Sequence, residues 1–333
     1  MASDLNLPES LYEDYSTPDL PVHGPASVAY WIQALQSHET KERALLILSQ
    51  IIMLSFQNKE IRKDLAPLLW NSIGTISALL QEIISVYRTL SSPNLTETAS
   101  TRVSNALALF QCVASHPETR KQFLKGNIYQ YWFQLCYSQA KLPLYLYPFL
   151  NTKDKEKPHE YLRLTSLGVI GTLVKSDDPE AIRFLLQTEI FPCCLTSMEV
   201  GSDLSKQVAT FIIYKILLHE EGLKYCCVLA DRFFAVARAL AQMTEKLVEQ
   251  PSPRLLKHII CCYHRLSQSP RACDGLRCCL PLWFGDRKFT SQLHGDFIAV
   301  RYLQELLSNI MARHEATRQP MRLLQPMQLM QLV

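Results

Sequence analysis

Between Glu160 and Leu186, apolar residues recur at the spacing of one face of an α-helix. Side chains three and four positions apart lie on the same side of a helix, so the residues of this face are expected in the core. An apolar helical face cannot be buried by the helix that carries it, so the pattern predicts packing against further helices. The face consists of Leu164, Leu167, Ile170 and Val174.

A second face of the same helix combines one aromatic residue with small residues. A glycine in the middle of a helix costs about 1 kcal/mol relative to alanine. Gly168 therefore indicates that another backbone or side chain approaches closely at this point. We expect this face to point outward and to receive a partner. It consists of Tyr161, Thr165, Gly168 and Thr172.

The helix is expected to end before Asp178, which can cap a second helix that begins at Pro179. Similar polar turns between apolar helices recur near Pro117, Glu221 and Pro270. The last two intervals, from Pro179 to Glu221 and from there to Pro270, are roughly 42 and 49 residues, in or near the ~40–47-residue period of HEAT and armadillo repeats. The first interval is longer. The predicted fold class is all-α, an armadillo/HEAT-like helical-repeat superhelix.

The same periodicity predicts further helices, one of which is apolar on more than one side. This helix, Asp64–Tyr87, has Leu69, Ile76, Leu80 and Ile83 on one stripe and Ile73, Ser77 and Ile84 on an adjacent one. Such a helix lies either deep in a core or partly under a partner. The other predicted helices are Ala26–Gln36, Thr40–Leu54, Arg102–Ser115, Leu204–Leu218 and Arg254–Leu266.

Two helices of the C-terminal half have faces that suggest binding. In Leu204–Leu218, Leu204, Phe211 and Ile212 are expected to pack, with Val208 near the opposite edge. Most charged faces are simply solvated, but a groove shared by several basic residues attracts phosphates or acidic peptides. The helix Arg254–Leu266 is expected to leave a basic stripe of Arg254, Lys257, His258, Cys261 and Arg265.

Composition and motifs narrow the function classes. The 333 residues carry a formal net charge of +3, so bulk electrostatics do not indicate a polyanion binder. The 11 cysteines include no C-x-x-C, which disfavours zinc and favours reduced, buried thiols in a cytosolic or nuclear protein. No apolar run is long enough to predict a membrane span. Because motifs for nucleotide binding, hydrolysis or metal catalysis are missing, we expect neither an enzyme nor a cofactor.

The predicted domain organisation has one repeat domain between two tails. Residues 1–24 are acidic and are predicted to form a disordered tail. Residues 312–333 are rich in Gln, Met and Leu and are predicted to form a flexible tail. The repeat domain covers residues 25–311. Residues 129–142 form an aromatic-rich insertion within the longer first interval.

Several blocks together resemble one family, the Rcd-one/Caf-forty family of cell-differentiation proteins. The resemblance covers roughly residues 26 to 310, outside both tails. The sequence departs from the family at the insertion 129–142 and over residues 47–61. The blocks are DLAPLLWNSIGTISALLQEI, NALALFQCVASHPETR, PLYLYPFLNT, EYLRLTSLGVIGTLVK, FLLQTEI, LSKQVATFIIYKILL and RLLKHIICCYHRLSQSPRA.

The resemblance implies a non-catalytic armadillo-repeat subunit of the CCR–NOT mRNA deadenylase complex. It implies docking on the large NOT scaffold subunit through Asn71, Ile73, Ser77 and Ile84, where the family usually has His, Phe, Ala and Val. It also implies that tryptophan-containing or helical peptide motifs of RNA-binding and silencing proteins bind the chain. For these peptides it points to Tyr161, Gly168 and Val208.

The resemblance leaves a second function open. Arg232, Arg254 and Arg271 match arginines of a basic concave groove with nucleic-acid affinity, which would suit a transcription cofactor. Homodimerisation is left open, and no membrane partner is expected. The implied locations are the cytoplasm, including P-bodies, and the nucleus.

Overall fold

The computed structural model describes residues 25–55, 59–91, 94–125, 141–285, 291–293 and 295–317. Within these ranges all regular secondary structure is helical and no strand is present, so the all-α prediction is confirmed. The chain divides into two compact units, with the boundary between Phe184 and Leu185. The predicted tail 1–24, residues 129–140 of the insertion and residues 318–333 lie outside the described ranges.

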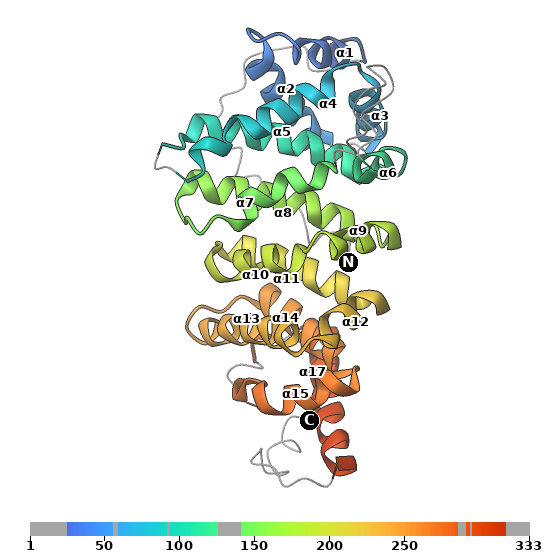
Figure 1. Cartoon of the computed structure of the whole chain (residues 1–333), viewed down its shortest axis with the longest axis vertical. Coiled ribbons are helices and arrows are strands. Elements are labelled where there is room, and N and C mark those ends of the chain that lie inside the picture. The colour runs from blue at the N-terminus through green and yellow to red at the C-terminus, as the bar shows by residue number, and fades with distance from the viewer. Residues whose placement is uncertain are drawn as a thin grey trace. The chain divides into compact units, whose positions relative to one another are not determined.

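The first unit is a stack of helices around α5 and α8, which lie side by side (Figure 1). Helices α2, α3 and α4 pack against α5, and α7 packs against α8. The helices of this unit are α1 (Pro25–Ala34), α2 (Lys41–Ser55), α3 (Lys59–Asn71), α4 (Thr75–Ser85), α5 (Glu97–Ser115), α6 (Pro117–Lys125), α7 (Tyr147–Asn151), α8 (Lys157–Lys175) and most of α9 (Pro179–Gln187), with 3-10 turns η2 (Tyr87–Thr89) and η3 (Leu142–Leu146).

The prediction of one long helix over Asp64–Tyr87 is wrong, because the structure breaks it into α3 and α4. The break lies at Gly74, whose φ of 80° is left-handed, a conformation that glycine adopts without a steric penalty. The side-chain amide of Gln36 donates a hydrogen bond to the carbonyl oxygen of Ile73 and fixes the turn. The end of α3 and the start of α4 are thereby brought to the surface together.

The helix–turn–helix unit at Glu160–Leu186 forms as predicted. Its four core positions are all buried, and Asp178 caps α9 by accepting a hydrogen bond from the amide of Glu180 at 2.9 Å. Asp177, with a φ of 52°, lets the chain reverse between α8 and α9. Consecutive helix pairs therefore share cores, as the armadillo/HEAT-like repeat prediction requires.

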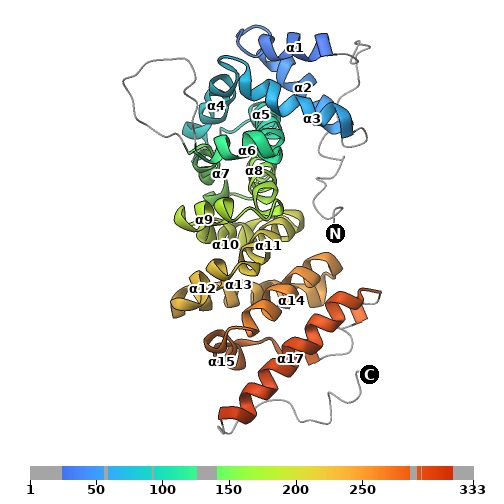
Figure 2. The same ribbon diagram turned by 90° about the vertical axis from the view of Figure 1, so that its right-hand side faces the viewer.

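The second unit continues the same pattern. Helix α11 packs between α10 and α14, and α17 packs against α14 and α15 (Figure 2). Helix α17 runs six residues past the predicted end of the repeat domain at residue 311. The helices are α10 (Ile190–Val200), α11 (Asp203–Leu218), α12 (Glu220–Val228), α13 (Ala230–Glu249), α14 (Pro253–Ser267), α15 (Pro270–Cys279) and α17 (Phe297–Thr317), with 3-10 turns η4 (Leu282–Gly285) and η5 (Ser291–Leu293).

Candidate binding surfaces

The most exposed apolar surface of the first unit lies along α4 and the turn before it. Ile73 is 75% exposed and Ile84 is 40% exposed, while Asn71 and Ser77 are also at the surface. Ser77 and Ile84 are seven residues apart within α4, so these two side chains share one side of the helix, and Ile73 lies in the turn before it. We call this set of four residues the α4 surface. Apolar groups gathered in water in this way are typical of protein–protein contacts.

The opposite side of α4 explains why the α4 surface keeps this orientation. Ile76, Leu79 and Ile83 are at most 5% exposed and pack in the core with α5. Rotating α4 to hide Ile84 would expose those three side chains. Leu68 of α3, 42% exposed, is a further apolar neighbour in sequence that the periodicity did not single out, because it lies outside both predicted stripes.

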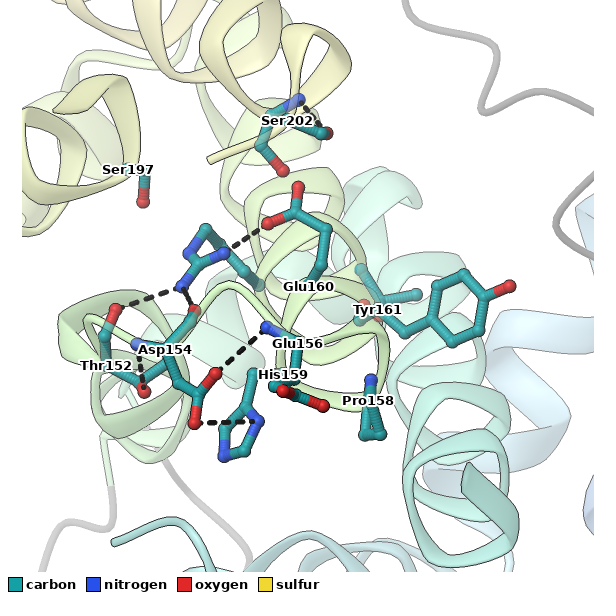
Figure 3. Close-up of polar contacts among 12 residues, drawn as sticks. Thr152, Asp154, Glu156, Pro158, His159, Glu160, Tyr161, Ser197 and Ser202 are labelled. Carbon is teal, nitrogen blue, oxygen red and sulfur yellow. Dashed lines mark hydrogen bonds and ion pairs between the residues drawn. The ribbon is translucent and has the colours of Figure 1, made fainter. Parts of the chain in front are cut away.

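The predicted peptide-binding residues have different surroundings. Tyr161 is half-buried, its ring points away from the polar cluster at the start of α8 (Figure 3), and the ammonium of Lys157 lies 5.5 Å from its ring centroid. Gly168 is buried, so the expectation that its whole face points outward is wrong. Thr165, one turn earlier, hydrogen-bonds Ser104 of α5 at 3.2 Å. The close approach that the small residues indicate is therefore made by α5.

Val208, in the second unit, is also buried, at 4% exposure, where the sequence placed it near an outer edge. Two residues predicted to pack, Leu204 and Phe211, are instead half-exposed, whereas Ile212 is buried as expected. Helix α11 is covered on two sides, by α10 and α14, so its buried arc is wider than one apolar stripe. A direct peptide contact at Val208 would require these helices to move.

A polar cluster at the start of α8 was missed by the sequence reasoning (Figure 3). The side chain of Arg163 is fully buried and forms an ion pair with Glu160. Its guanidinium also donates to the carbonyl oxygens of Thr152 at 3.0 Å and Asp154 at 2.6 Å. A buried charge needs such partners to offset its lost hydration. The only signal in the sequence is an arginine set among apolar residues.

The basic stripe predicted on α14 is largely neutralised. Lys257 lies 2.8 Å from the carboxylate of Asp296, and Arg265 pairs with Glu220 and donates to the carbonyl oxygen of Leu217 at 2.9 Å. His258 and Cys261, which the sequence placed on this stripe, are buried. Of the stripe, Arg254 alone is exposed.

The three arginines implied by the resemblance also differ from one another. Arg254 and Arg271 are exposed. The guanidinium of Arg232 instead lies 3.5 Å from the ring centroid of Tyr225 and donates to the carbonyl oxygen of the same residue at 2.6 Å. A stacked and hydrogen-bonded guanidinium is held in place, so Arg232 is less free than the other two to reach a phosphate.

The ten described cysteines are free of disulfides, which agrees with the prediction of reduced thiols. Burial raises the pKa of Cys194, Cys262, Cys273 and Cys279, and it raises the pKa of Cys261 to about 12. Cys227 differs: a hydrogen bond with the Cys226 thiol, another with Ser269 and the charge of Arg265 lower its pKa to about 7. Among the described residues, no cluster of histidine, cysteine or acidic side chains could hold a metal ion. None of the described helices could span a membrane.

Comparison with known proteins identifies the relatives of the chain. The family model described as "Cell differentiation family, Rcd1-like" matches residues 31–310. The cell differentiation protein rcd1 of Schizosaccharomyces pombe is 51% identical over 290 residues, which cover 87% of this chain and 95% of that protein. Protein CAF40 of Saccharomyces cerevisiae is 48% identical over 282 residues, which cover 84% of this chain and 70% of that protein.

One solved structure with low sequence identity shares the arrangement of helices. A crystal structure of an engineered protein aligns with a TM-score of 0.56 at 14% identity, covering 86% of this chain and 97% of that one. A designed armadillo repeat protein aligns with a TM-score of 0.48 at 16% identity, covering 87% of this chain and 99% of that one.

Proposed function

The chain belongs to the Rcd1-like cell differentiation family, and from this premise we propose that it is a non-catalytic adaptor subunit of the CCR–NOT mRNA deadenylase complex. In this role it docks on the NOT scaffold and receives short peptide motifs of RNA-binding and silencing proteins. It thereby promotes mRNA decay and translational repression, in the cytoplasm, including P-bodies, and in the nucleus.

One observation carries the proposal: the apolar side chains of Ile73, in the turn before α4, and of Ile84, on α4, are both exposed. Fully burying a side chain of this size is worth about 1.5–3 kcal/mol. A scaffold helix with an apolar stripe would gain that energy here, because helix-in-groove contacts are read through anchors at helical spacing. Asn71 and Ser77 are the exposed polar members of this surface.

The peptide partners are assigned mainly to Tyr161 in this proposal. Its half-exposed ring offers an apolar body and a hydroxyl, a combination common at binding surfaces. Gly168 and Val208 would influence peptide binding only through the packing of α8 and α11, because both are buried.

A pull-down of the purified full chain with the helical NOT scaffold fragment tests the docking step. Ile73→Asp and Ile84→Asp each place a charge on the α4 surface and are expected to weaken binding at least about tenfold. Val248→Asp on α13, where the side chain is 44% exposed, is the matched control and should bind as the parent does. Equal binding by all variants, or no binding by the folded parent, would reject the proposal.

A second candidate, nucleic-acid binding, is favoured by the exposed side chains of Arg254 and Arg271. Phosphate contacts by such residues release counterions, so the affinity would fall steeply with salt. Scaffold docking through apolar groups would depend on salt only weakly. The salt dependence of each complex therefore separates the two functions.

A further inference from the structure

Helix α17 is the last helix among the described residues, and one of its sides has no helix packed on it. Its inner side, with Ala299, Leu303, Leu306 and Ile310, is buried against α14 and α15 (Figure 2). On the outer side, Phe297 is 86% exposed, and Val300 and Met311 are also well exposed. The terminal element of a helical-repeat stack normally presents a polar outer face to water. An exposed Phe, Val and Met at this position need an occupant.

These residues form a continuous strip along the helix. The exposed positions 297, 300, 304, 308 and 311 follow one another at steps of three or four residues, so they share one side. The two in the middle are polar, Gln304 and Ser308. We call these five residues the α17 strip. Its chemistry is apolar at both ends and amide- or hydroxyl-bearing in the centre.

We propose that residues 318–333 of this chain bind back along the α17 strip. This segment follows α17 directly, after Thr317, and has 16 residues. At about 3.3 Å per residue it reaches about 53 Å, whereas the 21 residues of α17 span about 32 Å. The segment is therefore long enough to run antiparallel to α17 from Met311 to Phe297.

The composition of residues 318–333 suits the strip. Met and Leu side chains alternate with glutamines, and the segment contains no acidic residue. Methionine side chains adapt to irregular apolar surfaces. The glutamines match Gln304 and Ser308, since an amide both donates and accepts hydrogen bonds.

Tethering favours this occupant over a second copy of the chain. A segment joined to α17 is present at an effective concentration in the millimolar range, so a weak contact is sufficient. A stable dimer buries about 800 Å² on each partner. The three apolar side chains of the strip, at about 150–250 Å² for an aromatic residue and less for the others, offer a smaller apolar area than that.

Hydrogen exchange of α17 amides tests the proposal, with the full chain compared with a variant that ends at Thr317. Truncation is expected to speed exchange across residues 297–311 by at least about threefold, and a synthetic 318–333 peptide added in trans should restore the slow rate. Phe297→Asp in the full chain should reproduce the effect of truncation. Phe234→Asp on α13, where the ring is 42% exposed, is the matched control and should leave α17 unchanged.

Three results would overturn the proposal. The first is equal exchange in the full and truncated chains. The second is a peptide that fails to slow exchange in a truncated chain whose circular dichroism shows that it is folded. The third is a dimer that persists in the truncated chain and dissociates with Phe297→Asp, measured by light scattering, because the strip would then belong to a second copy.

Discussion

The carboxylate of Glu160 and the guanidinium of Arg163 form an ion pair at the start of α8, where the arginine side chain is completely buried. Arg163 also donates to the carbonyl oxygens of Thr152 and Asp154, in the segment that leads into the helix. One side chain thus connects the first turn of α8 to the chain that precedes it. From this arrangement we can predict how much stability the protein loses when either charge is removed.

Glu160→Gln should destabilise the protein by about 3 kcal/mol, because it leaves a buried guanidinium without a counter-charge. The double variant Glu160→Gln/Arg163→Met should recover part of that loss, since replacing both partners removes the uncompensated charge. Urea unfolding followed by circular dichroism measures both. Lys125→Met, at an exposed ion pair with Glu180, serves as the control and should change stability by no more than about 0.5 kcal/mol.

Gly222→Ala should lower the free energy of unfolding by about 3 kcal/mol. A Cβ added at Gly222 would lie 2.0 Å from the carbonyl oxygen of Ile216, so the turn between α11 and α12 would have to open. Gly295→Ala gives the comparison, because no atom lies within 4 Å of the added Cβ. Only the φ of 88° disfavours alanine there, so this variant should lose about 1 kcal/mol of unfolding free energy. Thermal unfolding should rank the two in this order, and the reverse order would contradict the steric explanation.

Ser77→Ala should strengthen scaffold binding by about three- to tenfold. The Ser77 hydroxyl is exposed in the free chain and would lose water against an apolar partner, whereas a methyl group gains from the same burial. Isothermal titration calorimetry with the scaffold fragment measures the change. Weaker binding would mean that the hydroxyl makes a hydrogen bond in the complex.

If the chain binds RNA, Arg254→Ala and Arg271→Ala should each reduce the slope of log K against log salt by about 1. Lys257→Ala should have less than about half that effect, because its ammonium already pairs with Asp296 at 2.8 Å. Fluorescence anisotropy with a labelled oligouridine at several salt concentrations provides the slopes. Equal slopes for Lys257→Ala and Arg254→Ala would show that the ion pair opens on binding.

Cys227 should be the first of the described cysteines to react with iodoacetamide. Its pKa of about 7, lowered by the hydrogen bond with Cys226 and then by Ser269 and Arg265, makes the thiolate the major form above pH 7. The alkylation rate should rise through pH 7 and level off near pH 8, as followed by peptide mass spectrometry. Arg265→Met should move this rise to higher pH, and an unchanged profile would exclude the guanidinium as a cause.

Helical periodicity predicted the core positions of α8, but it misplaced Leu204, Phe211 and Val208 on α11 and did not detect the break at Gly74. The stripe passes from Leu69 to Ile76, which are seven residues apart, so the sequence pattern continues across the turn without interruption. Only the backbone conformation at Gly74 distinguishes one continuous helix from two helices joined by a turn. The four residues of the α4 surface were nevertheless assigned to the surface that the structure exposes.

Contacts between distant parts of the chain were beyond the sequence reasoning. The small residues on α8 correctly indicated a close approach, but the partner was α5, which contains Ser104, rather than another molecule. Likewise, Lys257 is basic in the sequence, yet Asp296, 39 residues further along (296 − 257), neutralises it. Local patterns identify which face is unusual, and long-range packing decides what covers it.

The bonds that Arg163 makes to the backbone at Thr152 and Asp154 have a practical consequence for anyone wishing to label this protein. A connection between two helices is usually a safe place for a fluorescent reporter or an epitope tag. Here, extra residues in that connection would pull both oxygen atoms away from a cation that has no water to replace them. A reporter placed there would disrupt the folding it was meant to observe.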